Sequence, residues 1–234
     1  MTGLVVELCG LPGSGKTTVA RHARATLAER GVPAVVADRP ISAVAPRAAR
    51  MLRRTAYSAR AVASRPRWAL TACTDMAAVP QPSRRDTAAV IAQWLAVCDL
   101  SARGHRVPGV HLLEEGLVQT TWTLLLRSDV APPRRLWASL PAAVRSDLVV
   151  LVDVPVETAQ GRLERRASRH SRSQSLPAAQ LRVELERGRA LLEELTAAAP
   201  VPVVRLRGSD ATSAAALGAE LAEHVLAHVP DLVR

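Results

Sequence analysis

The chain has 234 residues, of which 48% are hydrophobic and 22% charged, and its formal net charge is +10. This length and apolar content predict a single domain, residues 1–234, with a substantial core. No apolar run approaches the roughly 20 residues that span a bilayer, and the first residues lack the pattern of a secretory signal. Three cysteines without metal-ligand spacing argue against a disulfide framework or a zinc site. We therefore expect a cytoplasmic protein with no membrane partner.

The positive charge alone suggests a nucleic-acid partner, because a basic face can bind phosphates. The chain has no Phe, one Tyr and four Trp, so few side chains are available to stack on bases. Arginine also replaces lysine almost everywhere, which indicates a compositional bias along the whole chain. We expect a small-molecule partner rather than nucleic acid, and the sequence is compatible with a homodimer.

The first elements in chain order form a strand–helix–strand unit. The apolar run Leu4 to Cys9 predicts a buried strand, and Thr17 to Arg30 predicts a helix that ends at Gly31. After Pro33, a second strand ends at Asp38. A unit of this length predicts a parallel sheet with helices on its faces.

Residues 41–103 are expected to be mainly helical and broken by prolines, with the clearest helix at Asp86 to Arg103. The remaining strands are expected at Val107 to Leu113, Leu148 to Val152 and Val201 to Leu206. Helices are expected at about Val156 to Arg169 and Ala178 to Ala197, with a last helix after the fifth strand. Five strands interleaved with helices predict a doubly wound α/β fold.

The loop between the first strand and helix reads GLPGSGKTT and fills the fixed positions of the phosphate-binding pattern GxxxxGK[ST]. Glycines let backbone N–H groups turn toward phosphate oxygens, and the helix N-terminus adds its positive dipole end. The residues expected to bind ATP are Gly10, Gly13, Ser14, Gly15, Lys16, Thr17 and Thr18. The Thr17 hydroxyl is expected to coordinate Mg²⁺.

Lys16 is the only lysine among 31 lysines and arginines. A compact ammonium fits between the β- and γ-phosphates, where a broad, planar guanidinium does not fit equally well. The same scarcity of lysine excludes the NKxD box by which GTPases recognise their base. Nucleotide binding is therefore expected to serve another class of reaction.

The chain resembles the nucleoside and nucleoside-monophosphate kinase group of P-loop proteins, and thymidylate kinase-like members in particular. The resemblance lies in the glycine loop, in Asp38-Arg39-Pro40 after the second strand, in Glu114-Glu115-Gly116 after the third, and in the segment from Leu148 to Arg166. It implies a three-layer P-loop NTPase fold with a five-stranded parallel sheet, a helical acceptor region at about 41–103 and a short arginine-rich lid at about 162–176.

The resemblance also implies catalytic roles. Glu114 would hold a Mg²⁺-bound water from the end of its strand, and Glu115 would face the acceptor, although two acids here could instead favour a helix N-terminus. The lid arginines would close over ATP and stabilise the transferring phosphoryl group. Their candidates are Arg162, Arg165, Arg166, Arg169 and Arg172, with Arg162 and Arg166 as the catalytic pair. The alternative for these arginines is a solvated basic face.

The acceptor site is less defined. Asp38 could take a proton from an attacking hydroxyl, as in nucleoside kinases, or Arg39 could hold an acceptor phosphate, as in monophosphate kinases. An Asx turn at Asp38 and a surface charge at Arg39 are the structural alternatives. Arg47, Arg50 and Arg54 recur at spacings of three and four and could grip an anion from one helix face, with a solvated face as the alternative. Trp94 and Gln119 could flank an acceptor ring, although a tryptophan on an apolar face commonly belongs to the core.

The sequence therefore predicts an enzyme, an ATP-dependent phosphotransferase that uses Mg²⁺ and acts on a nucleotide or nucleoside. Two alternatives stay open at this point. One is a kinase of a non-nucleotide metabolite or an antibiotic hydroxyl, and the other is a nucleotide-binding regulatory protein with little turnover.

Overall fold

The computed structural model describes residues 3–41, 46–126, 128, 137, 139–165 and 176–228. Its sheet consists of β1 (Leu4–Cys9), β2 (Ala34–Val36), β3 (Val110–Leu113), β4 (Leu148–Asp153) and β5 (Val203–Arg207). All pairings are parallel and the strand order is β2-β3-β1-β4-β5. This arrangement confirms the predicted five-stranded α/β sheet.

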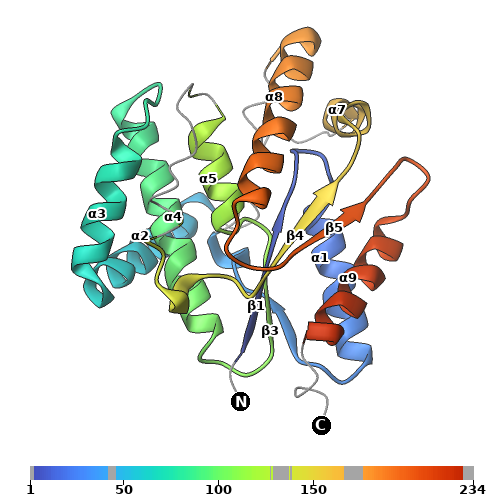
Figure 1. Cartoon of the computed structure of the whole chain (residues 1–234), viewed down its shortest axis with the longest axis horizontal. Coiled ribbons are helices and arrows are strands. Elements are labelled where there is room, and N and C mark those ends of the chain that lie inside the picture. The colour runs from blue at the N-terminus through green and yellow to red at the C-terminus, as the bar shows by residue number, and fades with distance from the viewer. Residues whose placement is uncertain are drawn as a thin grey trace.

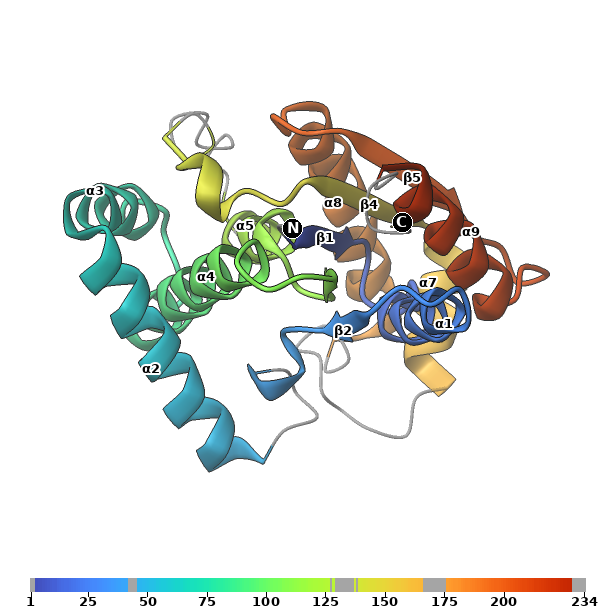
Figure 2. The same cartoon turned by 90° about the horizontal axis from the view of Figure 1, so that it is seen from below.

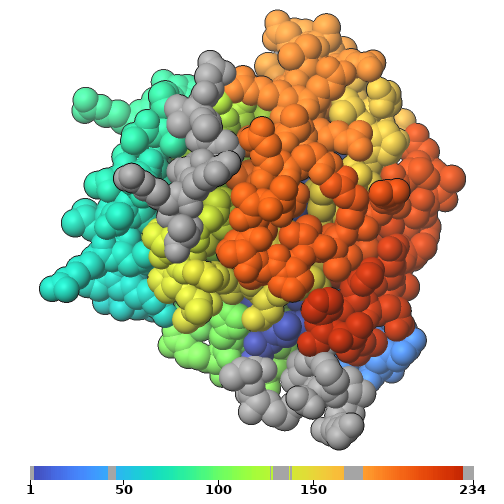
Figure 3. Space-filling view, viewed as in Figure 1, coloured from blue at the N-terminus to red at the C-terminus, as the bar shows by residue number. Residues whose placement is uncertain are grey.

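Helices cover both faces of the sheet (Figures 1 and 2). One face carries α1 (Lys16–Glu29) and α9 (Ala214–His228). The other face carries α4 (Arg84–Gly104), α5 (Leu117–Leu125) and α8 (Ala178–Ala197), with α2 (Arg47–Ser64) and α3 (Pro66–Ala77) packed outside them and α7 (Val156–Arg165) near the end of β4. In the space-filling view α8 lies over the middle of the face shown (Figure 3).

The three layers follow from the alternation of side chains along the strands. In β1, Val6 and Leu8 join the core beneath α1 and α9, whereas Val5 and Cys9 join the larger core beneath α4, α5 and α8. Both sides of the strand are therefore buried, as expected for a parallel sheet with two covered faces.

The central strands place their carboxyl ends at one edge of the sheet, and the strand order decides which loops meet there. Because β3 lies between β2 and β1, the residues that follow β3 lie next to both Asp38 and the glycine loop. Ligands in open α/β sheets bind at this edge.

The helical region is formed by α2, α3 and α4. Pro66 occupies the first turn of α3, where its missing N–H costs nothing, and the Ser83 hydroxyl accepts the Asp86 N–H to cap α4. The C-terminal half of α4 is buried, and the helix packs against α2 and α5. No helix of the described ranges has the length and apolar character needed to cross a membrane.

Some predicted boundaries shift. The third strand begins at Val110 rather than Val107, because the chain turns before it and Gly109 adopts φ 114°. The second strand ends at Val36, since Arg39–Ile41 forms a short 3-10 helix, η1. The arginine-rich helix is described as far as Arg165, and most of the predicted lid lies outside the described residues.

Candidate phosphate-binding and acceptor site

The glycine loop joins β1 directly to α1. Gly10, Gly13 and Gly15 all have positive φ, at 156°, 85° and 96°. A Cβ on Gly10 would lie 2.6 Å from the Val152 carbonyl oxygen, and one on Gly13 would lie 2.5 Å from that of Ala159. The loop conformation and its close approach to neighbouring backbone therefore both require glycine.

Lys16 folds back over this loop. Its Nζ donates to the carbonyl oxygens of Gly10 at 2.8 Å and Leu11 at 3.3 Å, and burial lowers its pKa, which the charges of Glu115, Cys9 and Glu114 partly oppose. The buried Ser14 hydroxyl has no hydrogen-bond partner among the described residues. The first N–H groups of α1 also lack carbonyl partners within the helix. These donors fit the phosphates of ATP.

Gln119 supports the loop from behind. This residue is buried on α5, and its Oε1 accepts the Gly10 N–H at 3.0 Å. The structure thus places Gln119 against the phosphate loop rather than beside an open acceptor pocket. Trp94 is 1% exposed and stacks on Trp68 with ring centroids 5.5 Å apart, so it lies in the core rather than at a surface that an acceptor ring can reach.

Thr17 and Glu114 meet at the edge of the loop. The exposed Thr17 hydroxyl donates to Glu114 Oε2 at 2.6 Å, which the neighbouring positions of β1 and β3 allow. A hydroxyl and a carboxylate oxygen beside a phosphate-binding loop are the ligand types that Mg²⁺ prefers. The predicted metal-binding pair is therefore brought together, and its chemistry fits the ion.

Asp38 lies on the other side of Glu114 and Glu115. It is 1% exposed, and its Oδ2 accepts the Glu115 N–H at 2.8 Å, whereas its Oδ1 has no partner among the described residues. Burial, followed by the negative charge of Glu114, raises its pKa to about 7. A carboxylate with such a pKa near neutrality can accept a proton from an alcohol as a general base. Arg39 is exposed at the start of η1.

Gln93, which was not predicted as a site residue, and Arg54 both adjoin Glu115. Gln93 on α4 donates from Nε2 to Glu115 Oε2 at 3.5 Å, and its Oε1 has no partner in the described structure. Burial lowers the pKa of the half-buried Arg54 on α2, and the charge of Glu115 opposes this shift. A signal existed for both: Gln93 is a polar residue within an apolar stretch of α4, and Arg54 continues the spacing of Arg47. Arg47 itself is exposed in the first turn of α2.

Of the predicted lid arginines, Arg162 reaches the loop. It donates to the carbonyl oxygens of Ser14 at 3.3 Å and Ser209 at 3.2 Å, and so it joins α7, the phosphate loop and the segment after β5. Arg165 ends α7 and its guanidinium lies near Gly161. The other candidates, Arg166, Arg169 and Arg172, lie outside the described residues.

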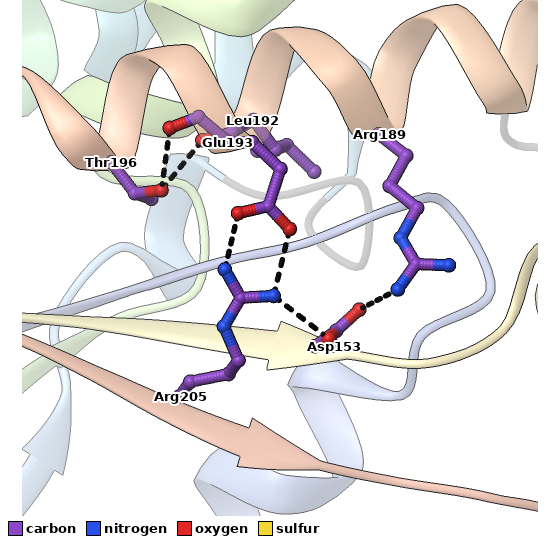
Figure 4. Close-up of polar contacts among 6 residues, drawn as sticks. All are labelled: Asp153, Arg189, Leu192, Glu193, Thr196 and Arg205. Atoms are coloured by element: carbon purple, nitrogen blue, oxygen red, sulfur yellow. Dashed lines mark hydrogen bonds and ion pairs between the residues drawn. The ribbon is translucent and has the colours of Figure 1, made fainter.

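A network of ion pairs fixes the end of β4, from which α7 departs (Figure 4). Asp153 pairs with Arg189 of α8 at 3.2 Å and with Arg205 of β5 at 3.0 Å, and Arg205 also binds Glu193. Hydrogen bonds to Glu193 and Asp153 raise the pKa of Arg205. The acid that ends β4 is thus held in structural contacts.

No family model and no curated protein matches the sequence. Among solved structures, thymidylate kinase from Candida albicans matches with a TM-score of 0.58 at 14% identity, covering 100% of this chain and 94% of that one. Deoxyadenosine kinase from M. mycoides matches with TM-scores of 0.52 with bound dCTP, at 11% identity, and 0.53 with bound dATP, at 10% identity. Both cover 96% of this chain and 100% of that one. At the level of the fold, the predicted resemblance is confirmed: the chain has the fold of P-loop nucleoside and nucleoside-monophosphate kinases.

Proposed function

We propose that the protein is a Mg²⁺- and ATP-dependent phosphotransferase, a small-molecule kinase whose acceptor is a nucleoside or nucleotide. The observation that carries this proposal is the row of groups at the sheet edge. Lys16 lies in the phosphate loop, Thr17 and Glu114 are 2.6 Å apart beside it, and the buried Asp38 follows behind Glu115. A fold shared with two nucleoside or nucleotide kinases supports the same class.

Each residue of the site has a separate role in the proposed reaction. Lys16 and the N–H groups of the loop bind the β- and γ-phosphates, and Arg162 adds positive charge next to the loop. Thr17 and Glu114 would hold Mg²⁺, directly or through a water, and the ion would neutralise charge on the phosphates. Catalysis by such a site rests mainly on positioning and electrostatics.

Asp38 points to a hydroxyl as the attacking group. Its Oδ1 is buried without a partner in the described structure, and a hydroxyl that donates to this oxygen would be oriented for attack. Because the pKa of Asp38 is about 7, the ionised form is populated at neutral pH. The oxygen that loses its proton to Oδ1 would then attack the γ-phosphorus in line with the leaving ADP.

The test measures ADP release from Mg-ATP in the presence of either the four deoxynucleosides or their 5′-monophosphates. Wild type is expected to release ADP only when an acceptor is present, and Lys16→Ala is expected to lose this release together with ATP binding. Arg21→Ala, which removes an exposed charge of α1, is the control expected to behave as wild type. ATP binding without acceptor-dependent release from either set would contradict the proposed function.

A further inference from the structure

Glu115 carries an exposed carboxylate between the phosphate loop and the helical region. Its negative charge acts on Lys16 from one side and on Arg54 from the other, and its Oε2 lies 3.5 Å from Gln93 Nε2. Its own N–H binds Asp38. The side chain therefore lies where groups from the turn after β2 and from α1, α2 and α4 converge.

Three buried polar atoms around Glu115 lack partners among the described residues: Asp38 Oδ1, Gln93 Oε1 and Arg54 Nε. Asp38 is 1% exposed and Gln93 is 9% exposed, so water reaches these side chains poorly. Buried polar groups are normally hydrogen-bonded, and unpaired ones in a native structure call for an explanation. Two free acceptors and one free donor in one place match a ligand with two hydrogen-bond donors and one acceptor.

The charges restrict this ligand further. Asp38 and Glu115 face the place where the acceptor would bind, and Glu114 adds a third carboxylate that is engaged with Thr17. The negative charge of Glu115 also acts on Arg54 of α2, and the partly exposed Arg50 lies one turn earlier on that helix. A phosphomonoester would bring about two negative charges next to the buried Asp38 carboxyl group and the exposed Glu115 carboxylate, and like charges at close range repel each other.

We propose that Glu115 makes the site select an uncharged hydroxyl compound as phosphoryl acceptor and reject phosphomonoesters, while Asp38 Oδ1 and Gln93 Oε1 bind hydrogen-bond donors of that compound. The proposal rests on the proposed kinase function and narrows its acceptor to a nucleoside-like alcohol. The acceptor oxygen forms a bond to the γ-phosphorus, the bond from this phosphorus to the β–γ bridging oxygen breaks, and the hydroxyl proton passes to Asp38 Oδ1. ADP and a phosphomonoester are the products.

The experiment compares kcat/KM for each deoxynucleoside with kcat/KM for its 5′-monophosphate, in wild type and in Glu115→Gln. Wild type is expected to favour the nucleoside at least tenfold. The variant, which keeps the side-chain shape but removes the charge, is expected to lower this preference at least tenfold, a change of about 1.4 kcal/mol. Glu29→Gln removes an exposed carboxylate at the end of α1 and is the matched control, with an unchanged preference.

Gln93→Leu gives a second readout. It removes the free acceptor Oε1 with little change in volume, so KM for the nucleoside is expected to rise about tenfold while KM for ATP stays constant. A purely structural role of Gln93 would instead lower kcat and thermal stability without this selective change in KM.

The outcomes separate the inference from the function on which it rests. Wild-type turnover of monophosphates that equals or exceeds turnover of nucleosides overturns the inference and leaves the kinase function standing. An unchanged preference in Glu115→Gln also overturns it. Silence with both sets of acceptors, while Lys16-dependent ATP binding persists, overturns the proposed acceptor class and the inference together.

Discussion

The Glu7 carboxylate lies directly beneath Gly116, so close that a Cβ on Gly116 would come within 2.4 Å of the Glu7 Cβ. Glu7 is fully buried on β1. It accepts hydrogen bonds from the Leu117 and Val118 N–H groups at 2.9 and 2.8 Å and from the Ser146 hydroxyl at 2.9 Å. A buried acid thus caps the N-terminus of α5, and Gly116 leaves the space for it. The glycine that follows the two site acids is explained by this contact.

Gly116→Ala is therefore expected to destabilise the fold by about 1–3 kcal/mol, because the methyl group must displace Glu7 or α5. The measurement is the free energy of unfolding in urea. Gly161→Ala is the matched control: its new methyl group would meet only the flexible Arg165 side chain within α7, and alanine favours a helix. Equal stabilities of Gly116→Ala and wild type would show that the contact relaxes without cost.

Lys16→Arg tests why the chain keeps a single lysine. The Lys16 ammonium lies 2.8 Å from the Gly10 carbonyl inside the loop, and a guanidinium is too broad for this position. We expect a loss of at least about 100-fold in kcat/KM for ATP, since the charge is kept but misplaced. Steady-state ADP release gives the value, and Arg21→Lys, the reverse exchange on the exposed face of α1, is expected to be neutral. Retained activity in Lys16→Arg would contradict this reason for the lone lysine.

Asp38 predicts a pH profile. Only the ionised carboxylate can accept a proton, so kcat/KM for the acceptor is expected to rise with pH, to bend near its pKa of about 7 and to level off above it. Asp38→Asn is expected to lose about 100- to 10,000-fold in rate and to lose this bend. A profile in Asp38→Asn with the same bend as wild type would assign the titration to another group.

The same carboxyl predicts a pH-dependent stability. Its pKa rises from an ordinary value of 3.8 to about 7 on folding, so between these pH values the folded state binds more protons than the unfolded state. The free energy of unfolding therefore falls as pH rises through this window. Asp38→Asn removes the cost of ionising a buried carboxyl group. Between pH 4 and pH 8, the free energy of unfolding of this variant is therefore expected to rise by about 1–4 kcal/mol relative to that of wild type. Urea unfolding at both pH values provides the measurement. If the free energies of unfolding of variant and wild type differ by the same amount at both pH values, Asp38 is not ionised at a cost in the folded state.

Arg162→Gln tests the contact between α7 and the phosphate loop. Arg162 bonds to the Ser14 and Ser209 carbonyl oxygens, and we expect its loss to raise KM for ATP about tenfold or more. Arg165→Gln is the control from the same helix, with a smaller expected effect on KM. If both variants change KM equally, general charge rather than the position of Arg162 attracts the nucleotide.

The features predicted from sequence were those encoded locally. The phosphate loop is continuous in sequence, and the apolar runs of β1 and β4 are buried on both sides, so pattern alone located them. The positions of Asp38 and Glu114 after their strands were also predicted. Their proximity depends on β3 lying between β2 and β1, an order that the structure shows and that the sequence pattern did not specify.

Other residues could not be placed from sequence because their partners are distant along the chain. The Gln119 side chain is engaged by Gly10, 109 residues earlier, and Trp94 finds its stacking partner on another helix. The contact between Gln93 and Glu115 likewise depends on how α4 packs in the fold, 22 residues before the strand end that carries Glu115. The contact with the Glu7 side chain that requires Gly116 also depends on β1 passing under α5.

The solitary lysine also allows selective chemical modification of the protein at one ε-amine. Because no other lysine side chain exists, an acylating reagent has a single ε-amine to modify, and the lowered pKa of Lys16 increases its fraction of neutral, nucleophilic amine near neutral pH. Protection of that amine by a bound nucleotide would be read as one mass difference on one peptide. Occupancy of the phosphate loop can thus be followed by mass spectrometry with any candidate ligand and without an engineered label.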